Sequence, residues 1–191
     1  QWIINRLNET ALKVNEELKR FRFNEAAKAI YEFTWSDFCD WYIEIAKTRF
    51  YGSDKHKAKE AQVVCTFVIK GILTLLHPYA PFITEEIWSY FKNDADKDLI
   101  VSPWLKGDRS IQNSMSDDSV DLLKQLVTAI RTIRSSMNVP QDKKANILIR
   151  GVGDYKSKIE SFEDIMMALG RIESLTLADE LEKPPQSATA V

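Results

Sequence analysis

The sequence predicts a mainly α fold, an antiparallel helical bundle followed by a small, incomplete α/β subdomain. Apolar residues recur every three or four positions through several long stretches before residue 138, which is the helical period. After that point the pattern changes to two short apolar runs on either side of one more helical stretch. We therefore expect a bundle over residues 1–138 and the α/β subdomain over residues 139–191, with strands at 146–150 and 172–177.

The pattern in the first 21 residues predicts one helix with a regular apolar face. Its core positions are Ile3/Ile4, Leu7, Ala11, Val14, Leu18 and Phe21. Trp2 and Arg6 are four residues apart and share another side of this helix. The cations that follow Leu18 suit the negative end of the helix dipole. They are Lys19, Arg20 and Arg22.

The stretch from Phe23 to Arg49 predicts one long helix with Asn24 as its N-cap. Its apolar residues cover more than the band of roughly 100° that a surface helix shows, so we expect an inner helix with neighbours on several sides. Three carboxylates, at Asp37, Asp40 and Glu44, form a row on it. We expect them to pair with a neighbouring helix or with Lys47.

Two more helices are predicted before a long connection. Asp54 caps a helix over 55–77, in which Gly71 indicates a close helix crossing, and Thr84 caps the next helix. The polar segment 93–116 connects to a fifth helix that begins after Ser116 or Ser119 and carries Arg134 on its outer side. Apolar residues should anchor this connection to the bundle: Ile100, Val101, Trp104 and Leu105.

The last part of the chain predicts a helix over 154–169, stopped by Gly170, between the two strands. Two strands alone make an unstable sheet. We therefore expect the natural chain to continue after the apolar residues at 190–191 and to supply another strand. Helical periodicity likewise begins at Trp2 without a capping residue, so we expect a longer chain at that end as well.

Composition excludes several classes of function. The 191 residues carry 26 Lys and Arg against 28 Asp and Glu, a net charge of −2, which argues against broad, sequence-blind nucleic-acid binding. No apolar run approaches the roughly 20 residues that span a bilayer, and no signal-peptide pattern occurs, so we expect no membrane partner. Both cysteines, Cys39 and Cys65, lie in apolar helical stretches and predict free buried thiols in a reducing cytosol.

No catalytic or metal-binding pattern is present. Neither histidine has a second ligand four residues away, and no P-loop or nucleophile motif occurs. The stretch Gly151-Val-Gly153 lacks the third glycine of a dinucleotide-binding loop. We therefore expect no catalytic residue, no metal and no cofactor in this chain.

Basic and aromatic residues leave two explanations open. Trp2 beside Arg6 could hold an unstacked base and a phosphate, or it could simply cover the edge of the bundle. The cations at Arg20 and Arg22, and those at Lys47 and Arg49, lie near helix ends, where positive charge also stabilises a helix by itself.

Four separated motifs resemble one enzyme family in order and spacing. They are WIINRL, EFTWSDFCDWYIEIAK, LTLLHPYAPFITEEIW and AIRTIRSSMNVPQDKKANILI. Together they resemble the C-terminal part of valyl-tRNA synthetases. The related isoleucyl, leucyl and methionyl enzymes carry a segment similar to PFITEEIW, whereas the form around Asp37–Lys47 looks specifically valyl.

This resemblance implies the anticodon-binding helical bundle of a class I synthetase and the start of its C-terminal α/β piece. The whole enzyme would join valine to its tRNA in the cytoplasm, using ATP and Mg²⁺. The catalytic signatures H-I-G-H and K-M-S-K-S are absent, as is the editing domain. The chain should therefore bind tRNA without activating an amino acid, next to catalytic and editing domains of the same polypeptide.

The resemblance also implies a set of tRNA-binding residues for the anticodon stem-loop of tRNA(Val). Trp2 would stack on a base, Asn5 would bond a base edge, and arginines would hold phosphates. The phosphate-binding residues would be Arg6, Arg20 and Arg22, together with Lys47 and Arg49. By contrast, we assign the motif residues Phe38, Trp41, Thr84 and Trp88 to packing and capping.

Two alternatives remain open at this point. A helical protein–protein interaction module with no RNA role would fit the slightly acidic charge. The equivalent domain of an isoleucyl enzyme would differ mainly around Asp37–Glu44.

Overall fold

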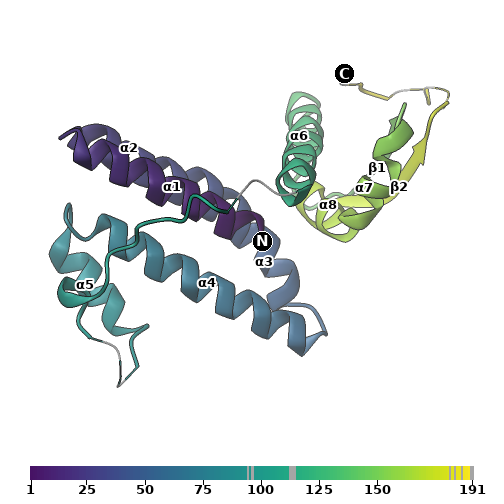
Figure 1. The fold of residues 1–191 in the computed structure, drawn as a ribbon. Helices are drawn as coiled ribbons and strands as arrows, with labels where there is room; N and C mark the ends of the chain where they lie inside the picture. The colour runs from purple at the N-terminus through teal and green to yellow at the C-terminus, as the bar shows by residue number, and fades with distance from the viewer. Residues whose placement is uncertain are drawn as a thin grey trace. The chain divides into compact units, whose positions relative to one another are not determined.

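The computed structural model describes residues 1–93, 95, 97–111, 115–180, 182, 184–185 and 187–189, without the side chains of 115–117. The chain forms two compact units, Gln1–Asn113 and Ser114–Val191. This division lies well before the predicted boundary at residue 138. It puts the fifth predicted helix in the second unit. The fold is mainly α with one small sheet, as the sequence predicts (Figure 1).

Helix α1, Trp2–Lys19, opens the first unit and buries the predicted apolar face. Ile3, Leu7, Ala11 and Val14 are all buried. Phe21 is not, because the helix ends at Lys19 and the chain reverses direction there. The prediction that Phe21 belongs to the core is therefore wrong.

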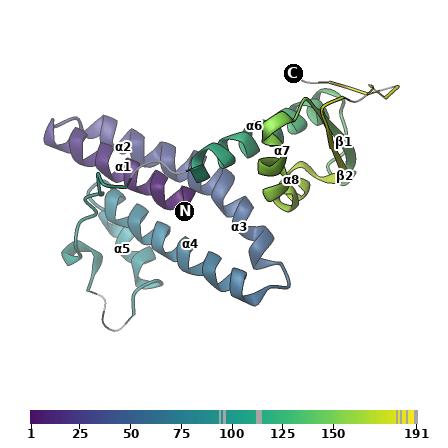
Figure 2. The ribbon, with the colours of Figure 1, turned by 45° about the vertical axis from the view of Figure 1, so that its right-hand side comes forward.

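The predicted long helix is one continuous rod with an unusual middle. It consists of α2 (Phe23–Glu32), the π-helix η1 (Phe33–Tyr42) and α3 (Ile43–Phe50). The rod packs on α1 and α4 (Figures 1 and 2). Its other side is open, since Tyr31 and Trp35 are exposed, so the inner-helix prediction holds for only part of its surface. Cys39 is exposed as well, whereas Cys65 is buried as predicted.

The cap predicted for this rod at Asn24 is wrong. The helix begins one residue earlier, and the Asn24 side chain donates to Glu25 Oε1 at 3.4 Å rather than capping an amide. The cap of α4, Lys55–Leu76, is confirmed. Asp54 Oδ1 accepts from the amides of His56 and Lys57 at 2.9 and 3.1 Å.

Gly71 is where α4 crosses α1 closely. A Cβ at this position would lie 2.7 Å from Leu7 Cδ2, so only glycine fits without moving the leucine. The crossing inferred from the sequence is therefore confirmed.

Helix α5, Pro81–Ser89, starts earlier than predicted because Pro81 is its first helical residue, a position that proline favours. Thr84 is therefore not the N-cap. Its fully buried hydroxyl donates to the carbonyl of Ala80 at 2.8 Å and bonds His77 Nδ1 at 2.8 Å. This bond ties the end of α4 to the start of α5.

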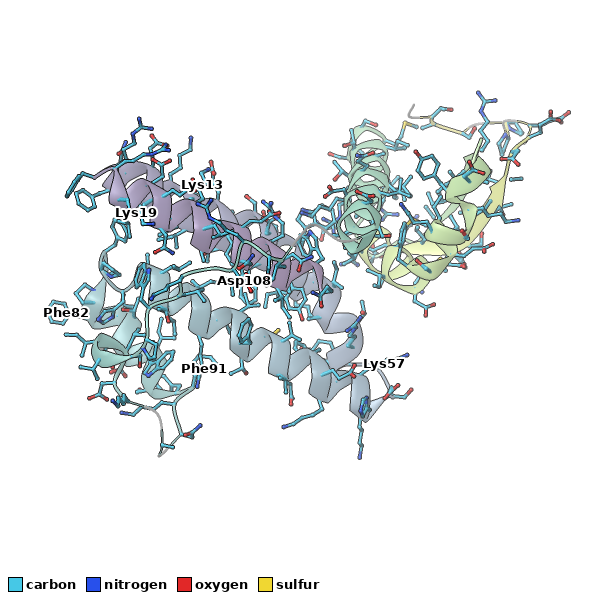
Figure 3. All side chains as sticks on the ribbon, viewed as in Figure 1. Lys13, Lys19, Lys57, Phe82, Phe91 and Asp108 are labelled. Atoms are coloured by element: carbon cyan, nitrogen blue, oxygen red, sulfur yellow. The ribbon has the colours of Figure 1, made fainter. Side chains whose placement is uncertain are left out.

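The connection after α5 runs back along α1. The short helix η2, Leu99–Val101, buries Leu99, but the predicted anchors Ile100 and Val101 are exposed. Trp104 Nε1 donates to Asn15 Oδ1 at 2.8 Å, and Asn8 exchanges two hydrogen bonds with the backbone of Asp108. Asp108, labelled in Figure 3, lies beside α1. Trp104 is thus an anchor, as predicted.

The second unit contains α6, Met115–Ser136, and a parallel pair of strands, β1 (Ala145–Arg150) and β2 (Ile172–Ala178). Ile147 pairs with Leu175 and Ile149 with Leu177. The segment between the strands is predicted as one helix. In the structure it forms η3 (Gly153–Tyr155), α7 (Lys156–Ser161) and α8 (Glu163–Gly170). Figure 2 shows the two strands side by side with α8 near them.

Two further predictions for the second unit are wrong. Arg134 is buried rather than outward, because its Nη2 donates to the carbonyls of Pro140 and Lys143 at 3.0 and 2.6 Å. Gly170 is the last helical residue, and Arg171 adopts the left-handed conformation that ends α8. The apolar residues 190–191, where a further segment is predicted to begin, lie outside the described residues.

Candidate nucleic-acid interface

The residues predicted to read bases lie in the protein core. Trp2 is 5% exposed and Asn5 is 2% exposed, and Asn5 Oδ1 accepts a hydrogen bond from Gln1 Nε2 at 3.2 Å. A base can stack only on a ring that presents its face to solvent. Trp2 as placed here is therefore a packing residue, and the second of the two explanations for it is the one that fits.

Arg6 is held by two carboxylates. Its Nε and Nη2 both lie 3.0 Å from Asp37 Oδ2 on the π-helix, and its Nη1 contacts Glu9 one turn along α1. Burial lowers the pKa of the guanidinium, but Asp37 and then Glu9 raise it more, so the pKa of Arg6 lies above its ordinary value. This arginine joins α1 to the rod, and a phosphate would have to displace both acids.

Arg20 and Arg22 share one carboxylate. They flank Phe21 in the turn between α1 and α2, and both approach Glu17, at 4.0 and 3.7 Å. Their side chains are about 60% exposed. Because the guanidiniums are exposed and lie this far from the largely buried Glu17 carboxylate, they remain accessible to an anion. Lys19, labelled in Figure 3, adds a third cation on the last turn of α1.

Lys47 and Arg49 lie on α3, near the opposite end of the rod. Lys47 Nζ lies 2.6 Å from Glu44 Oε1, one turn away, and Arg49 is exposed. At a rise of 1.5 Å per residue, about 35–40 Å of helix separates them from Arg22. The predicted residues thus form two separate basic ends, with Trp2 and Asn5 buried and Arg6 paired with two carboxylates, rather than one patch.

Sequence reasoning missed the exposed aromatic residues on this unit. Phe21 and Phe23 meet edge to face, with ring centroids 6.3 Å apart. Tyr31 and Trp35 are exposed and nearly parallel, also at 6.3 Å. The alternation Arg20-Phe21-Arg22-Phe23 is the signal that could have found the first pair, but helical periodicity assigned Phe21 to the core.

Two of the four motif residues are packing residues, as predicted. Phe38 and Trp88 are buried, and Trp88 Nε1 donates to the carbonyl of Lys97 at 3.0 Å. Glu85 has a related role, because its carboxylate accepts the amides of Leu99 and Ile100 at 2.8 and 3.1 Å. The segment therefore organises the α5 region rather than a ligand site.

The described residues contain no cluster of three or more His, Cys, Asp or Glu side chains that could hold a metal. The loop with two glycines after β1 is also closed to a phosphate, because the Gly153 amide donates to Asp179 Oδ1 at 2.7 Å. None of the helices in the described part of the chain has the length and apolar character to cross a bilayer.

Comparison with known proteins gives a consistent answer. The family model for the anticodon-binding domain of tRNA ligases matches residues 1–149. Valine–tRNA ligases of Fusobacterium nucleatum, Geobacter sulfurreducens and Thermotoga maritima are 37, 36 and 35% identical to this chain over its whole length. The chain spans about a fifth of their length, 22, 22 and 21% respectively. It therefore belongs to the anticodon-binding domain family of tRNA ligases, and it is similar to that region of valine–tRNA ligases.

Proposed function

We propose that this chain is the tRNA anticodon-binding region of a valine–tRNA ligase that works in the cytoplasm. The single observation that carries the proposal is the similarity to valine–tRNA ligases along the entire chain. The relatives named above are valine enzymes, which favours valine over isoleucine. The exposed cations at the two ends of the rod provide the positive charge that an RNA backbone requires.

In this proposal the bundle holds the anticodon stem-loop of tRNA(Val). Arg20 and Arg22 contact phosphates at one end of the rod, and Lys47 and Arg49 do so at the other. Holding the stem-loop fixes the distant acceptor end for ATP- and Mg²⁺-dependent aminoacylation in a catalytic domain elsewhere in the full-length ligase. Discrimination then comes from orientation as well as from affinity. Trp2, Asn5 and Arg6 support the bundle instead.

The partners of this region would be tRNA(Val) and the catalytic and editing domains of the same polypeptide. Those domains would lie in the part of the relatives' length that this chain does not span. The chain carries none of the signatures of the catalytic domain, so it should bind tRNA and leave valine uncharged.

The test is binding of the 191-residue chain to a fluorescent tRNA(Val) anticodon stem-loop across a range of salt concentrations. We expect weak, salt-dependent binding that falls when the anticodon is changed. A hairpin with the same stem and an unrelated loop serves as the matched control. Equal affinity for both hairpins, or no binding at low salt by a folded chain, would remove the anticodon-binding proposal.

A second assay addresses the absence of catalysis. The chain is incubated with valine, ATP, Mg²⁺ and tRNA(Val), and the charged tRNA is measured. We expect none above the level without protein. Charging by the isolated chain would contradict the proposed division of labour.

A further inference from the structure

The turn between α1 and α2 has a backbone conformation that its sequence does not favour. Phe21 has φ of 58°, in the left-handed region, where a bulky side chain is an outlier. The turn closes α1 with two hydrogen bonds, from the Arg22 amide to Glu17 O at 2.9 Å and from the Phe21 amide to Leu18 O at 3.0 Å. This is the Schellman pattern, in which glycine normally occupies the left-handed position. Phenylalanine here costs free energy that glycine would not.

Packing does not compensate for this strain. The Phe21 side chain is 80% exposed, and its ring meets the edge of Phe23, whose own ring is also largely exposed. A strained residue that gains nothing from burial points to a role outside the fold.

The surroundings of Phe21 indicate what the ring meets. Arg20 and Arg22 flank it in sequence, and Lys19 precedes them. Among the described residues, Glu17 is the acid that forms ion pairs with the two arginines, and it approaches them at 4.0 and 3.7 Å. Two arginines therefore lie on either side of an exposed aromatic ring, with Lys19 on the last turn of α1. This combination is typical of sites that bind unpaired nucleotides.

We propose that Phe21 is a stacking platform for an unpaired nucleotide of the bound tRNA, while Arg20 and Arg22 hold the neighbouring phosphates. The proposal rests on the proposed function and adds a specific contact to it. Phe23 supports the platform from the side, and Tyr79 Oη fixes the start of α2 by donating to the carbonyl of Phe23 at 2.9 Å.

The decisive variant is Phe21→Gly, because stability and binding should change in opposite directions. Glycine relieves the left-handed strain, so the thermal midpoint of the chain should rise. Removing the ring abolishes stacking, so the affinity for tRNA(Val) should fall by about tenfold. Phe21→Trp keeps a stacking surface and should keep the affinity within about threefold.

Two control variants separate stacking from general effects. Tyr90→Ala removes another exposed ring of the same unit, one whose hydroxyl lies beside Glu86 rather than among arginines, and should leave binding unchanged. Asn138→Gly relaxes a different left-handed residue, with φ of 50°, and should also leave binding unchanged.

The salt dependence distinguishes the ring from the cations. Phe21→Gly should shift the plot of log affinity against log salt without changing its slope, because the cations that bind phosphate are all retained. A fully paired RNA duplex of matched length should bind wild type and Phe21→Gly equally, since it offers no unpaired base.

The outcomes separate this proposal from the one on which it rests. If the wild-type chain binds no tRNA, the proposed function fails and the stacking platform fails with it. If the wild type binds and Phe21→Gly binds equally well, the platform alone is overturned, and the ring then belongs to a contact with other protein. Weaker binding together with a lower thermal midpoint would also overturn it, because the change would then be one of folding.

Discussion

Both ends of α1 carry an aromatic residue near arginine. At the start of the helix the ring is buried and the arginine is paired, whereas at the end both kinds of side chain are exposed. At the start, Trp2 is buried and Arg6 is held by Asp37 and Glu9. At the end, Phe21 is exposed, and its neighbouring arginines are exposed and approach Glu17 only to 4.0 and 3.7 Å. An aromatic ring beside an arginine is therefore not by itself a nucleic-acid signal. What matters is whether the ring faces a neighbouring helix or follows the last helical residue.

The largest expected effect tests the buried end. Trp2→Ala should destabilise the chain by about 3–5 kcal/mol, because it empties a core position. The matched control is Trp35→Ala, which removes an exposed indole from the same unit and should cost about 1 kcal/mol or less, the value of its contact with Tyr31. Urea unfolding followed by circular dichroism measures both. Equal losses would mean that the two tryptophans do not differ as described.

A smaller loss is expected for Arg6→Ala. The change leaves the largely buried carboxylate of Asp37 without this charged partner, which should cost about 1.5–3 kcal/mol. Arg109→Ala breaks the exposed pair with Glu16 and should cost under about 0.5 kcal/mol. The salt dependence of tRNA binding should not change with Arg6→Ala. A shallower slope would show that Arg6 reaches a phosphate after all.

The contrast between buried and exposed rings also predicts a pH effect at Tyr42, which packs against Ala46 and Cys65. Burial raises the pKa of Tyr42 to about 12, with a further rise from Cys65 and a decrease from Arg49. Because the folded pKa lies above the unfolded value of about 10, the stabilisation is complete below pH 10 and is lost as the pH rises towards 12. Since the side chain is only partly buried, we expect a loss of about 1 kcal/mol.

Tyr42→Phe is the control for this titration. The variant has no phenol to ionise, so the fall in unfolding free energy between about pH 10 and about pH 12 should be smaller by that amount. An identical pH profile for wild type and variant would mean that Tyr42 titrates as it does in the unfolded chain.

The smallest effect on stability is expected at the exposed end of α1. Replacing both Arg20 and Arg22 by Ala should cost less than about 1 kcal/mol of unfolding free energy, because the arginines are exposed and lie 4.0 and 3.7 Å from the Glu17 carboxylate, farther than Arg6 lies from Asp37. The same double variant should lower the slope of log affinity against log salt by about 0.7 for each phosphate of single-stranded RNA that is no longer neutralised. An unchanged slope would leave Lys47 and Arg49, at the far end of the rod, as the binding cations.

Much of the fold could be predicted because it depends on local rules. The spacing of Leu7, Ala11 and Val14 predicts the buried face of α1, and Asp54 and Gly71 are the cap and the crossing that their residue types favour. Both strands could be found from their short apolar runs.

The errors arise where tertiary contacts override a local pattern. The helical spacing of apolar residues cannot show that α1 ends before Phe21, nor that a left-handed backbone conformation turns this ring outward. It also cannot show that the carbonyls of Pro140 and Lys143 draw Arg134 inward from a polar helix face. The burial of Trp2 and Asn5 could not be predicted for the same reason, since it depends on elements that are distant in the sequence.

The segment that runs back along α1 has a consequence for how this protein is made. Asn8 and Asn15 find their hydrogen-bonding partners at Asp108 and Trp104, about ninety to a hundred residues later. During synthesis, these hydrogen bonds of α1 can therefore form only after nearly the whole first unit has left the ribosome. A nascent chain that stalls before residue 104 would keep this side of α1 uncovered, and we expect such chains to be the ones that chaperones and proteases recognise.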